Sequence, residues 1–526
     1  MLSEFRIPVM SCARAKAWEK RFFAPENAGT EAPPRERDFM RRAGTRIGDF
    51  ILSRLRERPP AHLLVLSGKG HNGGDALIAA RRVLSAFPRG SIPAKILFFA
   101  KDWDALAPLT MDAYEDFLRD CGKAPALFLT EKSPDALDAF LPRSRGGVVI
   151  DGVYGHGFRP PLREHVREAF TRLNALGDGD LRVSVDLPSG LSDSPVSVCA
   201  FAADFTCATG ILKTPLLDPA NSRCVGRVVP LAIGFPVEEE RICAADTRLA
   251  LERVPVQRPA FCDKRTFGRV LIVGGSRAMP GALMLNALAA LRGGAGLVSA
   301  LCPRSVHAAF AARAPGAMWI PCEETPEGAL ELRDALAKFR KFSARAGAVL
   351  CGSGMGDSPD AQALAQSVAA ETPEAAALVL DADALRPGTL SALRRSGANV
   401  LLPHHGEFLR LGGDPKNPET FLSRRPRVSA FALKGPFTEI LDAETRLITS
   451  AGTPALARGG SGDVLAGMTA TLFAERASRR DAPTPAELLA QAVCWHGAAA
   501  QRWELAQGTR TADVSALPDF FGDALP

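Results

Sequence analysis

Short runs of apolar, often β-branched residues alternate along the whole chain with alanine-rich stretches of helical character. Strands of a parallel sheet are buried on both faces and so read as nearly continuous apolar runs, and helices connect them. The pattern therefore predicts α/β domains with parallel sheets. In the first half of the chain, the expected strands are residues 62–66, 95–99, 148–150, 183–185 and 228–233.

The same alternation occurs again in the second half, but the two halves share no repeated motif. Residues 236–264, between the two series, are charged, contain three prolines and have weak periodicity. We therefore expect a domain boundary near residue 240, which divides the chain into domains 1–240 and 241–526. Two different domains have been fused, rather than one duplicated. The expected strands of the second half are residues 270–273, 348–351, 377–380, 400–402, 430–433 and 439–441.

Composition and charge narrow the class of protein. The formal net charge of +6 is small for 526 residues, and basic and acidic residues are interspersed, so nucleic acid is not an expected partner. The eleven cysteines include no CxxC pair, which argues against a disulfide framework and a zinc site and favours a reducing compartment.

No segment has the character of a secretion signal or a membrane span. The first 23 residues contain no uninterrupted apolar stretch, and residues 282–301 are interrupted by Arg292 and three glycines, which predicts a buried helix and turn. We expect a soluble, cytoplasmic homo-oligomer with no membrane partner.

The most informative stretch of the first half is "LLVLSGKGHNGGDALIAARRVL". A predicted strand ends at Leu66, a glycine-rich turn follows, and Asp75 is expected to open a helix. Free backbone N–H groups and the positive helix end would then face the turn, forming an anion or nucleotide cradle. The alternative is a tight turn whose glycines serve only steric needs. The stretch is neither a Walker A loop nor a GxGxxG fingerprint.

Two later strands of the first half end in aspartate, in "VVIDGVYGHG" and "VSVDLPSGL". In open α/β sheets ligands bind beyond the carboxyl ends of the strands, where Asp151 and Asp186 would project. Asn72, Asp151 and Ser189 offer oxygen ligands from three loops, which suits a hard cation. Taken singly, each aspartate is more often a cap or a turn residue.

The ordered motifs "GHNGGD", "DGVYGHG" and "VDLPSG" resemble the NAD(P)H-hydrate epimerase domain, whose fold is Rossmann-like with three layers. The likeness covers about residues 5–236. It implies that Asn72, Asp151 and Ser189 hold a potassium ion and that Asp186 binds the substrate beside the reacting carbon. The other substrate contacts that it implies are His71, Asn72, Gly73, Gly74, Asp75, Gly155, His156, Gly157, Phe158 and Arg159.

The second half contains "LARGGSGDVLAGM", four glycines around one serine and one aspartate. A GGSGD turn at a helix start gathers backbone N–H groups into an anion nest and places Asp463 at its rim. This arrangement suits phosphoryl transfer, because the N–H groups stabilise the moving phosphoryl group while Asp463 takes the proton of the attacking hydroxyl. The alternative is a helix start at which Asp463 only interacts with the helix dipole.

Several further segments, among them "GRVLIVGGSRAMPGALM", "LCGSGMG", "LLPHHGEFLRL" and "FALKGPFTEI", resemble in their order the ADP- or ATP-dependent NAD(P)H-hydrate dehydratases, which have a ribokinase-like fold. The likeness covers about residues 260–515. It implies magnesium with ADP or ATP, and contacts of Ala282, Gly354, His404 and Asp463 with the hydrate. The implied nucleotide-binding residues are Lys434, Gly435, Pro436, Phe437, Thr438, Gly459, Gly460, Ser461 and Gly462.

Together the two resemblances predict a repair enzyme for NADHX and NADPHX, the hydrates of NADH and NADPH. One half would interconvert the R and S epimers, with Asp186 as general acid and base, and the other would dehydrate the S epimer, with Asp463 as base. The sequence departs from the families' usual residues at His71, His405 and Thr453. Two alternatives remain open at this point: a ribokinase-like vitamin or sugar kinase, and an N-terminal half that is a non-catalytic binding module.

Overall fold

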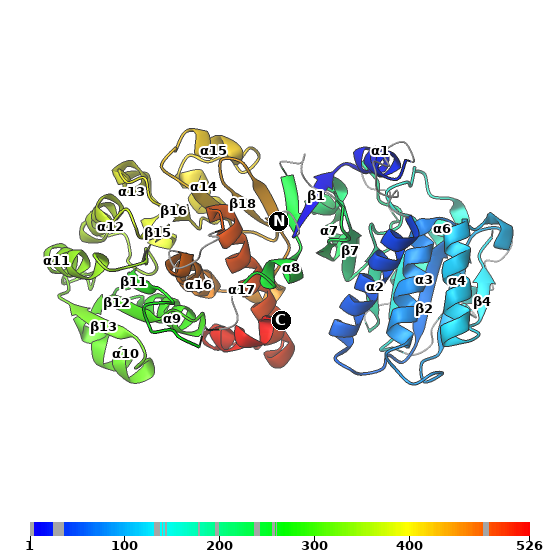
Figure 1. Ribbon diagram of the computed structural model, residues 1–526, viewed down its shortest axis with the longest axis horizontal. Coiled ribbons are helices and arrows are strands. Elements are labelled where there is room, and N and C mark those ends of the chain that lie inside the picture. The colour runs from blue at the N-terminus through cyan, green and yellow to red at the C-terminus, as the bar shows by residue number, and fades with distance from the viewer. Residues whose placement is uncertain are drawn as a thin grey trace. The chain divides into compact units, whose positions relative to one another are not determined.

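The computed structural model describes residues 5–24, 36–130, 137–138, 140–141, 145–176, 179–194, 199–235, 242–254, 258, 260–476 and 483–526. The chain divides into two compact units, Met1–Asp246 and Thr247–Pro526 (Figure 1). The two units are described separately.

The N-terminal unit is built on a parallel sheet with the strand order β4-β3-β2-β5-β6-β7-β9. Successive residues of a strand point to opposite faces, and both faces are buried: Val65 belongs to one apolar core, and Leu64 and Leu66 belong to the other. The strands are β2 (Leu63–Gly68), β3 (Ala94–Phe99), β4 (Ala126–Phe128), β5 (Val148–Gly152), β6 (Leu181–Val185), β7 (Phe205–Thr209) and β9 (Arg227–Leu231).

Helices cover both faces of this sheet. α2 (Glu36–Leu55), α3 (His71–Leu84) and α4 (Pro108–Cys121) lie side by side over one face (Figure 1). Their apolar residues pack against the core that contains Val65. α6 (Glu164–Ala175) packs on the opposite face through Phe170. The unit is therefore the three-layer α/β arrangement predicted from the sequence.

A small second set of strands lies outside this sheet. β1 (Arg6–Met10) pairs antiparallel with β10 (Ile242–Ala245) and parallel with β8 (Leu212–Lys213). β1 leads into α1 (Cys12–Phe22), and α7 (Ser222–Val225) precedes β9. None of these short strands was expected from the alternation of apolar and polar residues.

The C-terminal unit contains strands in the order β13-β12-β11-β14-β15-β16-β17-β18-β19. Neighbours are parallel from β13 to β17 and antiparallel from there to β19. The strands are β11 (Arg269–Val273), β12 (Leu297–Pro303), β13 (Met318–Cys322), β14 (Ala348–Cys351), β15 (Ala377–Leu380), β16 (Asn399–Leu401), β17 (Ala430–Leu433), β18 (Thr438–Leu441) and β19 (Arg446–Thr449).

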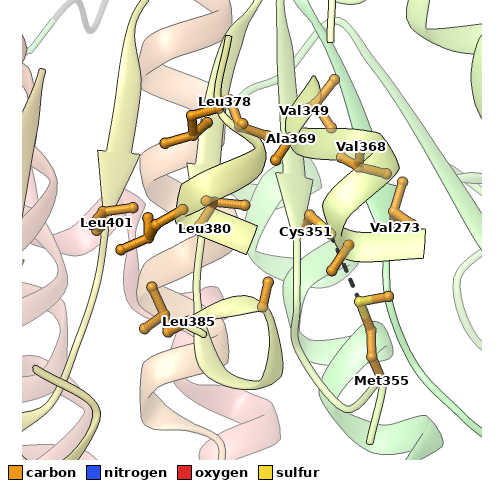
Figure 2. Close-up of a cluster of buried hydrophobic side chains, with 14 of the residues drawn as sticks. Val273, Val349, Cys351, Met355, Val368, Ala369, Leu378, Leu380, Leu385 and Leu401 are labelled. Atoms are coloured by element: carbon orange, nitrogen blue, oxygen red, sulfur yellow. Dashed lines mark hydrogen bonds between the residues drawn. The ribbon is translucent and has the colours of Figure 1, made fainter. Parts of the chain in front are cut away.

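Alternate residues of the C-terminal strands face two different layers of helices. Figure 2 shows Val349, Leu378, Leu380 and Leu401 packed with Val368 of α12 on one face. α16 packs against α9 and against the strands β11 and β14. The helices are α8 (Thr247–Leu251), α9 (Pro280–Arg292), α10 (His307–Arg313), α11 (Leu332–Ser343), α12 (Pro359–Glu371), α13 (Pro387–Ala392), α14 (His405–Arg410), α15 (Glu419–Ser423), α16 (Ser461–Arg476) and α17 (Pro485–Gln507).

The predicted fold class is confirmed. Each strand predicted in the two series is present, with ends that differ by at most two residues from the prediction. The expectation for residues 282–301 is right for the helix and turn but misses the strand β12 that begins at Leu297. Among the described residues, no helix is both long and apolar enough to cross a membrane.

Candidate active sites

The first candidate site lies where the strand order of the N-terminal sheet reverses direction. β2 lies between β3 and β5, and ligands commonly bind beyond the carboxyl ends of strands at such a point. Here the unit contains a cavity of about 1410 Å³. The predicted contact residues that line it are His71, Asn72, Asp75, Gly155, His156, Gly157, Phe158, Arg159 and Asp186.

The glycine-rich turn after β2 is shorter than the sequence pattern indicates. α3 begins at His71, so the prediction that Asp75 opens the helix is wrong. Gly73 and Gly74 lie inside the first turns and are not among the residues that line the cavity. A Cβ atom on Gly73 would lie 2.2 Å from the last backbone oxygen of β2, and one on Gly74 would lie 2.8 Å from Met40 Sδ. Close packing therefore accounts for these two glycines.

The predicted cation ligands lie close to one another. Asp151 follows the buried core of β5, and its carboxylate accepts hydrogen bonds from Ser189 Oγ at 2.6 Å, Ser189 N at 2.9 Å and Ser184 Oγ at 2.9 Å. Asn72 Nδ2 donates to the carbonyl of Val185 at 3.1 Å, which brings Asn72 to the end of β6. Its own side-chain oxygen lies 3.2 Å from the position of a Cβ on Gly155.

Asp151 has only neutral hydrogen-bond donors. Burial of this residue raises its pKa, and the hydrogen bonds from Ser189 act in the opposite direction. Within the described ranges Asp151 forms no ion pair with a lysine, arginine or histidine. Among the same residues, no three or more His, Cys, Asp or Glu side chains are grouped so that they could hold a metal ion. Any cation here would therefore rely on hydroxyl, amide and backbone oxygens beside a single carboxylate.

Asp186 is held by a buried lysine. Its Oδ1 forms an ion pair with Lys213 Nζ and accepts from Thr209 Oγ1 at 3.4 Å, while its Oδ2 lies 3.3 Å from His156 Nδ1. Burial alone would raise the pKa of Asp186, but the charge of Lys213 and the contact with His156 outweigh it and hold the pKa below its usual range. The side chain is therefore ionised at neutral pH. Its φ of +66° is a left-handed conformation.

The contacts of His156 extend from Asp186 to the helix α1. His156 Nε2 lies 3.3 Å from Glu19 Oε2, so the imidazole lies between two carboxylates. Burial raises the pKa of Glu19, whereas Lys213 and His156 lower it. Glu19 therefore joins the group of charged side chains that line the cavity.

Asp75 contrasts with Asp186. It is 9% exposed, and its Oδ1 has no hydrogen-bond partner among the described residues. Burial raises its pKa well above the usual value, and the negative charges of Asp186 and Glu19 act in the same direction. The protein environment therefore shifts the pKa values of Asp75 and Asp186 in opposite directions within one cavity.

Two residues of this site, Lys213 and Glu19, were missed by the sequence reasoning. Lys213 lies in the apolar run "ATGILKTPLL", and a lysine there is informative, because a buried lysine requires a charged partner. Glu19 lies on an amphipathic helix and carries no comparable signal. The pairing of β1 with β8 and the hydrogen bonds from the start of α1 to Asp193 bring this helix into this part of the fold.

The second candidate site is formed by the GGSGD turn. α16 begins at Ser461, and Gly460, with a φ of +91°, makes the turn before it. Ser461 Oγ donates to the carbonyls of Leu456 at 2.8 Å and Arg458 at 3.1 Å, which fixes the turn on the preceding segment. Asp463 lies in the first turn of the helix, as predicted. Free N–H groups and one carboxylate therefore lie together at this helix start.

A buried ion pair lies beside this turn. Lys434 Nζ is 2.7 Å from Asp381 Oδ1 and 3.4 Å from the position of a Cβ on Gly462. Burial raises the pKa of Asp463 to about 6, and the negative charge of Asp381 adds to this effect. Burial acts to lower the pKa of Lys434, but Asp381, Glu407 and Asp463 outweigh it, so the ammonium group stays charged. Three carboxylates thus surround one cation.

The predicted hydrate contacts lie around the same turn. Gly354 has a φ of +66°, and a Cβ there would lie 3.0 Å from Ala282 Cβ, so these two residues are adjacent. His404 forms a β-bridge with Lys434. Its Nδ1 accepts from the backbone of Gly406 at 3.0 Å and caps α14. The side chain of His404 is half exposed, which leaves its ring accessible.

The predicted nucleotide loop connects β17 and β18. It contains Lys434, Gly435, Pro436 and Phe437 and ends in Thr438 at the start of β18. His405 approaches this loop, with its Cε1 3.0 Å from the position of a Cβ on Gly435. The loop and the GGSGD turn therefore meet through Lys434.

Comparison with known proteins agrees with this division into two sites. A family model described as YjeF-related protein N-terminus matches residues 36–215, and one described as NAD(P)H-hydrate dehydratase matches residues 270–519. The bifunctional NAD(P)H-hydrate repair enzyme Nnr of Thermosynechococcus vestitus is 32% identical over 495 residues, which cover 90% of each chain. The chain belongs to the family of bifunctional NAD(P)H-hydrate repair enzymes. A second member, from Gloeobacter violaceus, is 33% identical over 89% of each chain.

Solved structures are also similar to this member of the repair-enzyme family. The ADP/ATP-dependent NAD(P)H-hydrate dehydratase of Bacillus subtilis, crystallised with ATP and Mg²⁺, is 26% identical, with a TM-score of 0.43, and the match covers 52% of this chain and 94% of the other. A ribokinase-like superfamily protein of Enterococcus faecalis is 25% identical, with a TM-score of 0.46, and covers 56% of this chain and 99% of its own. Asp75, His156, Asp186 and Lys213 of the N-terminal cavity lie within residues 36–215, which the first family model matches. Glu19 lies outside the ranges matched by both family models.

Proposed function

We propose that the chain repairs NADHX and NADPHX in two steps, one in each unit. The N-terminal unit interconverts the R and S epimers, and the C-terminal unit dehydrates the S epimer with ADP or ATP. The observation that carries the proposal is the position of Asp463, which lies in the first turn of α16 beside Lys434 and the loop that Lys434 opens. Membership of the repair-enzyme family supports it.

The C-terminal geometry fits dehydration through a phosphate ester. Asp463, with a pKa of about 6, is ionised at neutral pH and accepts the proton of the hydrate hydroxyl. The hydroxyl oxygen bonds to the terminal phosphorus of the nucleotide as the bond from that phosphorus to the bridging oxygen breaks, which releases AMP from ADP or ADP from ATP. N–H groups of the GGSGD turn and Lys434 stabilise the charge on the phosphoryl group. The ring nitrogen then expels phosphate, and loss of a proton from the neighbouring carbon restores the dihydronicotinamide. A magnesium ion bound with the nucleotide would neutralise phosphate charge.

The N-terminal geometry fits reversible loss and return of the same hydroxyl. The ionised Asp186 lines the cavity with Asp75, whose acid form can donate a hydrogen bond. In this scheme the ionised Asp186 first acts as a base and accepts a proton. It can then act as an acid by donating that proton. Acid–base catalysis of this kind contributes about 10² to 10⁴-fold.

A potassium ion fits beside Asp151. The carboxylate is completely buried and receives only neutral hydrogen bonds, so a monovalent cation would compensate its charge. Asn72, Asp151 and Ser189 would hold the ion, together with nearby backbone oxygens. Replacement of potassium by tetramethylammonium, which is too large for such a site, should lower the rate of epimerisation but not the rate of S-hydrate dehydration. Equal epimerisation rates in the two salts would remove the ion from the proposal.

Mixed epimers of NADHX provide the test of the whole function. With nucleotide, the full chain should restore the near-ultraviolet absorbance of NADH beyond the S fraction and toward completion. The Asp186→Ala variant should consume the S epimer at the normal rate and then stall, apart from slow spontaneous interconversion. Completion at the wild-type rate would make Asp186 structural and the N-terminal unit a binding module.

The kinase alternative is not favoured by the family to which the chain belongs. It predicts that a phosphate ester accumulates and that no reduced nicotinamide is recovered. The proposal also includes a cytoplasmic homo-oligomer, and the eleven free cysteines agree with a reducing compartment.

A further inference from the structure

Three side chains of the N-terminal unit form a continuous row that leads from the surface to the buried Asp186. Glu19 Oε2 lies 3.3 Å from His156 Nε2, and His156 Nδ1 lies 3.3 Å from Asp186 Oδ2. The exposed fraction of the side chain falls along this row, from 23% at Glu19 and 21% at His156 to 5% at Asp186. An imidazole with a carboxylate on each ring nitrogen can accept a proton at one nitrogen and release one from the other.

The fold fixes the outer member of the row. The carboxylate of Asp193, in the loop that follows Asp186, accepts from the backbone N–H groups of Cys12 at 2.7 Å and Ala13 at 2.9 Å, and so caps α1. The loop that carries Asp186 therefore also anchors the helix that carries Glu19. Pairing of β1 with β8, the strand of Lys213, provides a second attachment.

We propose that Glu19 is a positioning residue for epimerisation, which orients His156 and exchanges protons with solvent in a relay formed by Glu19, His156 and Asp186. This inference rests on the proposed epimerase function. The proposal assigns a role in epimerisation to Glu19 and to the helix α1, which lie outside the sequence motifs.

The relay satisfies the proton balance of the reaction. When the hydroxyl group leaves the ring carbon, its oxygen keeps both electrons of the carbon–oxygen bond, takes a proton and departs as water. At the same time the ring nitrogen forms a double bond to that carbon. In return, the oxygen of water attacks the other face, the double-bond electrons go back to nitrogen, and the water releases a proton. That proton passes to Asp186 and then to His156 Nδ1, as His156 Nε2 delivers one to Glu19. The opposite movement supplies the proton for departure.

The charges around Asp186 and Glu19 support proton transfer from Asp186 through His156 to Glu19. Lys213 pairs with the other oxygen of Asp186 and leaves Oδ2 for His156. The charged and titratable groups that act on Glu19 are Lys213, His156, Asp186 and His71, and Asp75 lies near Glu19 and Asp186. Burial raises the pKa of Glu19, which makes its carboxylate a better proton acceptor.

The test uses the full chain and purified R-NADHX, with the two epimers separated by chromatography. Glu19→Gln should lower the kcat of epimerisation by about tenfold or more, with KM within about twofold, and should increase the solvent deuterium isotope effect. Acetate should partly restore the kcat of Glu19→Ala, because a small carboxylate can take the vacated position. Glu164→Gln, which removes an exposed glutamate paired with Arg167, is the matched control and should match wild type.

The outcomes separate the relay from the function on which it rests. A wild-type kcat in Glu19→Gln overturns the relay. So does a loss that appears mainly in KM and is not restored by acetate, because Glu19 would then only shape the cavity. A wild-type protein that dehydrates the S epimer but does not interconvert the epimers overturns the epimerase function itself, and the relay with it.

Discussion

Lys434 Nζ lies 2.7 Å from Asp381 Oδ1, and this ion pair lies next to Asp463, the proposed base. The pair does more than neutralise a lysine. Lys434 favours the ionised form of Asp463, whereas Asp381 disfavours it, so the two partners act on the base with opposite sign.

The first prediction follows from this opposition. Dehydration should require ionised Asp463, so its kcat should fall about tenfold per pH unit below the pKa of about 6. Asp381→Asn removes a negative charge near Asp463 and should move this acid limb to lower pH. The measurement is the pH dependence of S-hydrate dehydration between pH 4.5 and 8. If the acidic side of the pH profile of kcat is the same in Asp381→Asn and wild type, Asp463 is not the base that titrates.

Asp463→Asn should reduce nucleotide-dependent dehydration by about 10² to 10⁴-fold and leave epimerisation intact. The amide keeps the size of the side chain but cannot accept the proton, and the epimerase cavity belongs to the other unit. Asp360→Asn is the control, because Asp360 also lies in the first turn of a helix, α12. If both variants retain dehydration, Asp463 only interacts with the helix dipole.

Lys213→Met should destabilise the N-terminal unit by about 3 to 5 kcal/mol, because it leaves the carboxylate of Asp186 buried without its cation. The double variant with Asp186→Asn removes both charges and should be less destabilised than the sum of the single variants. Chemical denaturation followed by tryptophan fluorescence measures both effects. Additive losses would mean that the two side chains do not interact energetically.

Asp75→Asn should stabilise the N-terminal unit, and increasingly so as the pH rises. Folding raises the pKa of Asp75, so the wild-type stability is complete below the pKa of the unfolded chain and is lost as the pH rises toward the folded pKa. Asparagine avoids this loss, which amounts to at most about 1.4 kcal/mol per pH unit. Thermal denaturation between pH 4 and 8 checks the trend. A constant difference across this range would contradict it.

Most strands of the two sheets were predictable from the sequence, because a buried parallel strand needs an apolar run, but the parallel strands β4, β7, β12 and β13 were missed. The same rule located Asp151, Asp186 and Asp463, since chemistry gathers at the carboxyl ends of strands and at helix starts. β8 escaped prediction because its two residues carry too little pattern to distinguish them from a loop, and β1 escaped because Pro8 interrupts its five residues.

Pairings between distant side chains were not predictable in the same way. Glu19 meets His156, and Lys213 meets Asp186, only after strands and helices far apart in the sequence have packed. The charge state of a group depends on these neighbours. The sequence therefore located Asp186, but it did not show that the pKa of Asp186 is lowered or that the pKa of Asp75 is raised.

The left-handed backbone at Asp186 has a consequence for how this enzyme can evolve. A non-glycine residue with a φ of +66° costs about 1 kcal/mol or more, although aspartate and asparagine tolerate it better than most. Glycine would relieve this strain, but it would also leave the buried ammonium group of Lys213 without its carboxylate, which costs about 3 to 5 kcal/mol. Because the loss of the ion pair outweighs the relief of strain, stability and epimerisation favour the same residue at this position.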